Sequence, residues 1–147
     1  MSFQHILVPI DGSEISYAAA RKASIVAQSF GAKVTAISLI NEDPFTDADF
    51  YYGTAIMRDY FAQAHSNAKS ALAGAKKIFE SYNVPSDTKI IEGEVSAEHI
   101  NDIAQKLNAE LIVMGSHGRK GVQKFFLGSF ANDVLQSTHL PVLFIKE

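Results

Sequence analysis

Short apolar runs alternate with segments of helical periodicity along this chain, and this alternation restricts the possible folds more than any other feature of the sequence. The runs that are apolar enough for buried strands cover residues 5–10, 34–40, 88–91, 111–114 and 141–145. A strand, a helix and a parallel strand form the expected repeating unit, with a right-handed crossover. Five strands with four helices between them predict an α/β fold, in which helices cover both faces of a parallel sheet.

The segments between the runs carry helix start and stop signals. Ser13 and Ser96 are suitable N-terminal caps, and Gly31 is placed to end the first helix. The longest segment, residues 54–82, contains no proline and repeats apolar side chains at helical spacing. It predicts a helix of about 40 Å, long enough to cross the whole sheet, with Gly74 as its weak point.

Length and composition describe an ordinary globular chain. With 147 residues and no internal repeat or linker, it is expected to form a single domain over residues 1–147. No run approaches the ~20 apolar residues that cross a bilayer, and no secretion signal is expected at the start. The absence of cysteine fits a reducing compartment, so a cytoplasmic location is expected. A net charge of −3 argues against a general nucleic-acid-binding protein.

A glycine-rich stretch, residues 115–130, joins the fourth apolar run to the last helical segment and reads GSHGRKGVQKFFLGSF. It combines glycines that let the backbone approach a ligand with the cations Arg119, Lys120 and Lys124. That combination suits an anion, above all a phosphate chain, although neither GxxxxGK[ST] nor GxGxxG is present. The alternative is a flexible surface connection, in which Ser129 is only a helix cap and the cations are only solvated.

Several segments fall at the carboxyl ends of predicted strands, where open parallel sheets bind their ligands. They are Asp11, the pair Leu39 and Ile40, and residues 115–118, and they converge if strands one and four are neighbours. Residues 42–53 are acidic and aromatic and predict a long loop after the second strand. This loop could fold over a ligand, or its rings could simply cover the core.

The glycine-rich stretch also carries a specific spacing, Gly-x2-Gly-x9-Gly-Ser, formed by Gly115, Gly118, Gly128 and Ser129. This spacing resembles the nucleotide-binding signature of the universal stress protein family. The resemblance extends to the opening ILVPIDGS at residues 6–13 and to the closing LPVLFI at residues 140–145. It implies a doubly wound five-stranded parallel sheet of order 3-2-1-4-5, in which strands one and four are neighbours.

The same resemblance implies a site for ATP, ADP or AMP. The matching positions are Pro9, Ile10, Asp11, Leu39, Met114, Gly115, His117, Gly118, Arg119, Gly128, Ser129 and Phe130. Leu39 and its neighbours on strand one would frame the adenine, Asp11 would lie near the ribose, and the start of the last helix would meet the terminal phosphates. Phe130 departs from the family, which usually has a small aliphatic residue there. It could narrow the phosphate end of the site or point into the core.

The sequence predicts no metal site built from side chains alone. The residues His5, His65, His99 and His139 are scattered without the spacing of metal ligands. A Mg²⁺ ion would instead arrive with the phosphates and lie near Asp11.

The resemblance implies a cytoplasmic protein that binds ATP or another adenine nucleotide and regulates a stress response. One alternative is a slow ATP hydrolase or an adenylyl- or phosphoryl-transfer enzyme, for which Asp11 and His117 are the only candidate bases. Neither has a partner that spacing can assign, so no ATPase activity, or only a very weak one, is expected. A second alternative is a nucleotide-independent dimeric interaction module. A phospho-receiver domain is rejected, because Asp11 is the only acid at the end of the first strand.

The last strand is apolar and would leave an exposed edge unless another strand covered it. The resemblance implies a homodimer that pairs these edges across a two-fold axis, through Val142 and Phe144.

Overall fold

Strands and helices alternate in a computed structural model, which describes residues 3–41, 54–117 and 127–146. In chain order the elements are β1 His5–Pro9, α1 Glu14–Phe30, β2 Lys33–Ile40, α2 Thr54–Ser81, β3 Ser86–Glu92, α3 Ala97–Lys106, β4 Leu111–Gly115, α4 Ser129–Ser137 and β5 Val142–Ile145. Every predicted strand and helix is present, with small shifts at its ends. The predicted loops at residues 42–53 and 118–126 lie outside the described residues.

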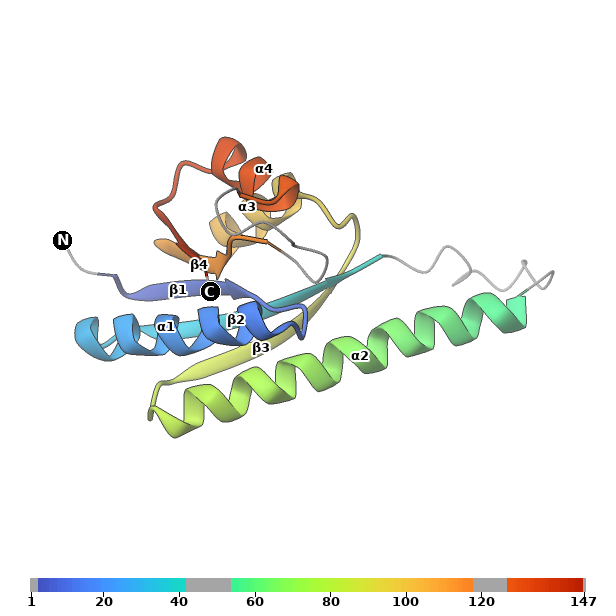
Figure 1. Cartoon of the computed structure of the whole chain (residues 1–147), viewed down its shortest axis with the longest axis horizontal. Coiled ribbons are helices and arrows are strands. Elements are labelled where there is room, and N and C mark those ends of the chain that lie inside the picture. Colours follow the sequence, from blue (N-terminus) through green and yellow to red (C-terminus); the bar gives the residue numbers. More distant parts are fainter. Residues whose placement is uncertain (1–2, 42–53, 118–126, 147) are drawn as a thin grey trace.

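The strands form one parallel sheet in the order β3-β2-β1-β4-β5. Figure 1 shows α1 and α2 on one face of this sheet and α3 and α4 on the other. The chain builds outward from β1 through β2 to β3, and then returns to place β4 on the opposite side of β1. The predicted doubly wound fold is therefore confirmed, with its strand order reversing between β1 and β4.

Each face of the sheet has its own apolar core, because successive side chains of a strand point to opposite faces. In β1, Ile6 and Val8 belong to the core under α1 and α2, whereas Leu7 belongs to the core under α3 and α4. The side chains that α1 buries are mostly small: Ala18, Ala19, Ala20, Ala23 and Ala27. They let α1 lie close to the sheet. Burial of large aliphatic side chains such as Leu7 stabilises the fold by ~1.5–3 kcal/mol each.

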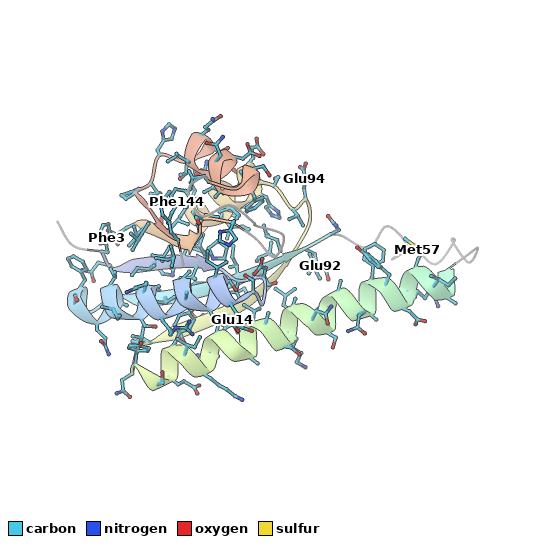
Figure 2. All side chains as sticks on the ribbon, in the orientation of Figure 1. Phe3, Glu14, Met57, Glu92, Glu94 and Phe144 are labelled. Carbon is cyan, nitrogen blue, oxygen red and sulfur yellow. The ribbon has the colours of Figure 1, made fainter. Side chains whose placement is uncertain are left out.

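Helix α2 is continuous over 28 residues, as predicted, but only part of it covers the sheet. Residues 55–60 are all exposed, including Ile56 at 81%, whereas the turns around Leu72 and Phe79 are buried. Figure 2 places Met57 on the part of α2 that extends past the sheet. No described helix, α2 included, is both long enough and apolar enough to cross a membrane.

Gly74 is a packing position of α2 and leaves the helix unbroken. A Cβ atom at Gly74 would lie 2.7 Å from the Tyr17 hydroxyl oxygen and 3.0 Å from the ring carbon that bears it. The same hydroxyl donates a hydrogen bond to the Ala71 carbonyl, at 3.2 Å. The missing side chain at Gly74 thus makes room for the ring that joins α1 to α2.

His5 is a buried polar side chain at the amino end of β1. Its Nδ1 lies 2.9 Å from the Leu107 carbonyl oxygen, and its Nε2 lies 2.7 Å from the Thr35 hydroxyl. Because a carbonyl can only accept, Nδ1 carries the proton and Nε2 accepts from Thr35. Burial lowers the pKa of His5 below its usual 6.5, against the opposing effect of the Leu107 carbonyl.

We expect this buried imidazole to make the protein less stable in mild acid. Because the folded-state pKa is lowered, the unfolded chain binds more protons just below pH 6.5. The stabilisation is therefore complete above that pH and is lost as the pH falls toward the folded-state pKa. Urea unfolding at pH 7.5, 6.5 and 5.5 should show a smaller loss of stability for His5→Gln than for the wild type. The exposed His139→Gln is the control, and equal pH slopes in all three proteins would contradict the assignment.

We expect Gly74→Ala to destabilise the protein although alanine is the better helix former. The substitution gains ~1 kcal/mol of helix propensity, but overpacking against Tyr17 costs ~1–3 kcal/mol, so a net loss of about 1 kcal/mol is expected. In a Tyr17→Leu background the same substitution should become stabilising, because the ring is gone. Chemical unfolding of the four proteins measures both effects. A stabilised Gly74→Ala single variant would show that the ring moves aside at little cost.

Candidate functional site

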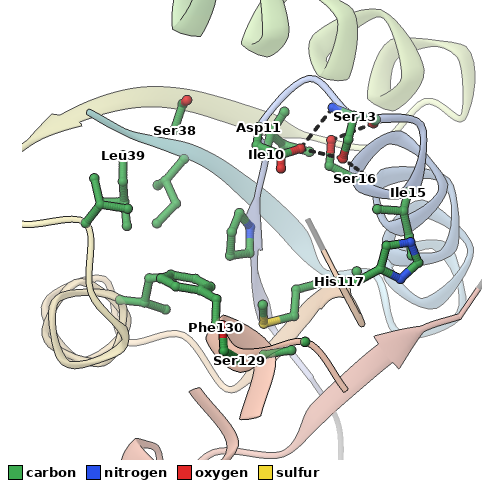
Figure 3. Close-up of a pocket in the computed structure, with 18 residues that line it drawn as sticks. Ile10, Asp11, Ser13, Ile15, Ser16, Ser38, Leu39, His117, Ser129 and Phe130 are labelled. Atoms are coloured by element: carbon green, nitrogen blue, oxygen red, sulfur yellow. Dashed lines mark hydrogen bonds between the residues drawn. The ribbon is translucent and has the colours of Figure 1, made fainter. Parts of the chain in front are cut away.

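A cavity of about 570 Å³ opens at the carboxyl edge of the sheet, where the strand order reverses (Figure 3). The ends of β1, β2 and β4 meet there with the first turns of α1 and α4. Its volume is within the range typical of small-molecule sites, and open α/β sheets bind ligands at this position.

The predicted site residues come together in this cavity as far as the structure describes them. Those that line it are Pro9, Ile10, Asp11, Leu39, Met114, Gly115, His117, Gly128, Ser129 and Phe130. Gly118 and Arg119 lie outside the described residues, as do Lys120 and Lys124. Sequence reasoning therefore selected residues that are distant in the chain and adjacent in space.

Further lining residues were missed: Ser13, Ile15, Ser16, Ile37, Ser38, Val95, Ile100 and Ala131. The first three could have been found, because they form the first turn of the helix that follows Asp11. Val95 belongs to the turn after β3, a strand end that was not considered. Nothing in the sequence distinguishes Ile37 or Ile100 from other core residues.

Part of the cavity lining is apolar, and we call this part the apolar slot. We define it by the side chains of Leu39, Val95, Ile100, Met114 and Phe130. Apart from Val95, they belong to the core under α3 and α4 or pack against it. Val95 stands outside that core and is 45% exposed. The slot is therefore an opening into the end of the core.

Several hydrogen bonds hold the turn that carries Val95. The Gly93 N–H donates to the Ile40 carbonyl at 3.1 Å, which ties the turn to the end of β2. Nδ1 of His99 donates to the Glu94 carbonyl at 2.8 Å, and Ser96 caps α3 by accepting from the His99 N–H. Gly93 has a φ of 143°, which favours glycine. Val95 thus stands on a backbone that other contacts fix.

The backbone of Leu39 faces the cavity because β1 ends before β2 does. The last bond between the two strands runs from the Ile10 N–H to the Ile37 carbonyl, at 2.8 Å. Peptide groups two residues apart on a strand point to the same side, so the Leu39 N–H and C=O also point toward the β1 side. No β1 residue pairs with Leu39 in the described sheet. This leaves one donor and one acceptor at the rim of the slot.

Asp11 organises the start of α1. Its Oδ1 accepts hydrogen bonds from both the N–H and the hydroxyl of Ser13. Ser13 is the N-terminal cap of α1 and accepts from the Ser16 N–H at 3.2 Å. Asp11 is therefore not itself the helix cap but holds the residue that caps. It keeps an exposed carboxylate in the lining of the cavity.

Ser116 connects the two described ends of the glycine-rich stretch. The Gly128 N–H donates to the Ser116 carbonyl at 2.7 Å, and the Ser116 N–H donates to the Ile145 carbonyl at 2.8 Å. A Cβ atom at Gly128 would lie 3.2 Å from the Cα of His117 and 3.3 Å from the Ser116 carbonyl oxygen. Glycine at position 128 therefore has a structural role, because it lets the start of α4 approach the end of β4.

Helix α4 begins at the cavity without a side-chain cap. Gly128 occupies the cap position, so the alternative that Ser129 is the cap is wrong. The first backbone bond of the helix runs from the Asn132 N–H to the Gly128 carbonyl, at 2.9 Å. Among the described residues, no partner bonds to the N–H groups of residues 129–131. Three amide donors therefore point out of the helix start, where the helix dipole favours negative charge.

Few groups of the described lining can ionise. They are the Asp11 carboxylate and the His117 imidazole, whose Nδ1 lies 3.2 Å from the Ser116 hydroxyl. The described residues contain no group of three His, Cys, Asp or Glu side chains that could hold a metal ion. The arrangement as a whole suits a ligand with a flat apolar part at one end and an anion at the other.

Comparison with known proteins places this geometry in a family. The sequence model of the protein family described as "Universal stress protein family" matches residues 2–146 of this chain. Universal stress protein MJ0531 of Methanocaldococcus jannaschii is 34% identical over 145 residues, which are 99% of this chain and 83% of the relative.

Solved structures of universal stress proteins have the same fold. UspA from Lactobacillus plantarum superposes with a TM-score of 0.83 at 22% identity, over 99% of both chains. A protein from Archaeoglobus fulgidus in complex with dAMP gives 0.75 at 22% identity, over 99% of this chain and 100% of that one. A universal stress protein in complex with cAMP gives 0.73 at 20% identity, over 99% and 98%. With a family match over nearly its whole length and a relative above 30% identity, this chain belongs to the universal stress protein family.

Proposed function

We propose that this protein binds an adenine nucleotide in the cavity at the carboxyl edge of the sheet and acts as a nucleotide-dependent regulator. The observation that carries the proposal is the pairing of an apolar slot with an uncapped helix start in one cavity. A nucleotide has the matching asymmetry, with a flat base at one end and phosphate at the other.

The slot and its rim suit adenine. The Leu39 C=O can accept from the amino group of adenine, and the Leu39 N–H can donate to the adjacent ring nitrogen. The neighbouring side chains of Val95, Ile100 and Met114 supply apolar surface for the base. The rim of the slot therefore reads the hydrogen-bonding edge of the base, while its walls exclude water.

The start of α4 suits the phosphate end. The amides of residues 129–131 have no partner in the described residues, and the Ser129 side chain is exposed beside them. Helix starts of this kind bind phosphate through N–H groups and the helix dipole. We assign Gly118, a position of the family spacing, to the same end, together with the neighbouring cation Arg119. We also assign a Mg²⁺ ion to the phosphates near Asp11.

Two solved relatives are described as complexes with dAMP and with cAMP, which supports an adenine nucleotide as the ligand class. The same proposal includes ADP and ATP, which add further phosphates to AMP. We also propose a cytoplasmic location and a role in a stress response, which membership of the family supports. We favour regulation over turnover, because one oxygen of the Asp11 carboxylate is engaged in holding Ser13.

We expect nucleotide-stripped protein to bind AMP in a calorimetric titration, and Asp11→Asn to weaken that binding about tenfold. The substitution keeps an oxygen for Ser13 but removes the charge-assisted bonds to ribose hydroxyls, each worth ~1.5–3 kcal/mol. Asp133→Asn is the control, because Asp133 is exposed on α4 outside the cavity lining. Absence of binding by AMP, ADP and Mg-ATP would refute the proposed function. Equal affinity of wild type and Asp11→Asn would refute only the role of Asp11.

We also propose that two copies pair through the open edge of β5. The carbonyls of Pro141 and Ile145 accept hydrogen bonds from the N–H of Ile112 in β4 and from the N–H of Ser116 just after it. Because the direction of the peptide groups alternates along a strand, those of Val142 and Phe144 face the open side. The side chains of Val142 and Phe144 pack against the core under α3 and α4, whereas Leu143 is 39% exposed on the other face. The backbone of these two residues, rather than their side chains, is therefore the natural pairing surface.

We expect Val142→Pro to weaken the dimer at least tenfold in sedimentation equilibrium. Proline removes an N–H that faces the open edge and leaves the β4–β5 bonds in place. Val142→Thr keeps that N–H and a branched side chain, so it is the matched control. If Val142→Pro remains folded and dimerises like the wild type, the interface lies elsewhere on the molecule.

A further inference from the structure

Phe130 is the one Phe, Tyr or Trp side chain among the described residues that line the cavity. It is the second residue of α4, and part of its ring packs against the core under α3 and α4. The remainder of the side chain is exposed to the cavity. Phe130 therefore packs into the core, which is one of the two options that the sequence left open, and it also forms part of the cavity lining.

The wall across the slot from Phe130 is aliphatic and fixed. Figure 3 shows the Phe130 ring and the Leu39 side chain on opposite sides of the same opening. Val95 adds to the lining from the turn after β3, which is bonded to Ile40 through the Gly93 N–H. The slot thus has one aromatic wall and one aliphatic wall, each on a backbone that other elements hold in place.

We propose that Phe130 is an affinity-determining residue of this site and acts as a stacking surface for a planar nucleobase; this rests on the proposed function. A planar heterocycle that lies between a flat ring and an aliphatic wall contacts apolar surface on both of its faces. The Phe130 N–H belongs to the uncapped start of α4. One residue therefore meets the ligand twice, with its ring at the base and its amide toward the phosphate.

Because the Phe130 ring meets the base and the Phe130 amide meets the phosphate, their contributions to affinity can be measured separately. Substituting the side chain removes the stacking and leaves the amide in place. The loss should therefore be the same factor for a nucleoside and for its nucleotide. A residue that acted on the phosphate end would instead reduce the affinity for the nucleotide alone.

The test is a calorimetric titration of nucleotide-stripped protein with adenosine and with AMP. Phe130→Leu should lose about tenfold in affinity for both ligands, equivalent to ~1.4 kcal/mol, which is within the range for loss of one base–aromatic stack. Phe130→Tyr keeps a ring and should lose less than Phe130→Leu. Leu135→Ala is the control for the stability of α4, because Leu135 is exposed and outside the lining.

A second measurement does not depend on a variant that must fold. The ring protons of Phe130, assigned by through-space contacts in the wild type, should shift upfield when adenosine is added. An unchanged Phe130 ring signal with adenosine bound would overturn the inference, as would equal affinities of Phe130→Leu and wild type. In both cases binding itself persists, so the proposed function stands. No binding of adenosine, AMP, ADP or Mg-ATP by the wild type would overturn both.

Discussion

Strand β1 must be hydrogen-bonded along both edges and buried on both faces, and the remainder of the fold is arranged around this requirement. β2 and β4 supply the two edges, and the two helix pairs supply the two faces. Parallel neighbours bring their carboxyl ends to the same edge of the sheet. Because β1 stops at Pro9 while β2 continues to Ile40, this edge is uneven, and the cavity opens at the step.

The helices that reach this edge differ in how their first turns are satisfied. Ser13 caps α1 and Ser96 caps α3, each with a side-chain oxygen. α4 starts from Gly128 and has no such cap. The glycine is required by the close approach to Ser116 and His117, so the same packing constraint that selects it also leaves the helix amides open. Local structure and binding chemistry therefore have one cause at this position.

Much of the fold could be predicted because its signals are local. The apolar runs and the caps at Ser13 and Ser96 place the elements, but the order of the strands came from the family resemblance. Periodicity does not say which strands are neighbours. The extension of α2 past the sheet was missed, since the stripe through Met57 and Phe61 repeats as regularly as its buried continuation.

The candidate site was predictable where a motif or a strand end marked it, as at Asp11 and Gly128. It was not predictable where tertiary packing alone decides, as for Val95, which lies beside the expected cap Ser96 in a turn that carries no ligand motif. The interpretation of Ser129 as a helix cap failed for a related reason. Serine is the better cap by preference, but the contact between the Gly128 N–H and the Ser116 carbonyl shifts the helix start by one residue.

The extension of α2 also gives the molecule a gradient of local stability. Around Phe79 the helix amides lie over the sheet, so their exchange with solvent deuterium requires opening of the core. Around Ile56 no described side chain is buried, and a helical turn without tertiary contacts is marginal in water. Along this single helix, amide protection should therefore decrease steadily from the carboxyl end to the amino end. The native state is thus most tightly ordered at one end of α2 and opens first at the other.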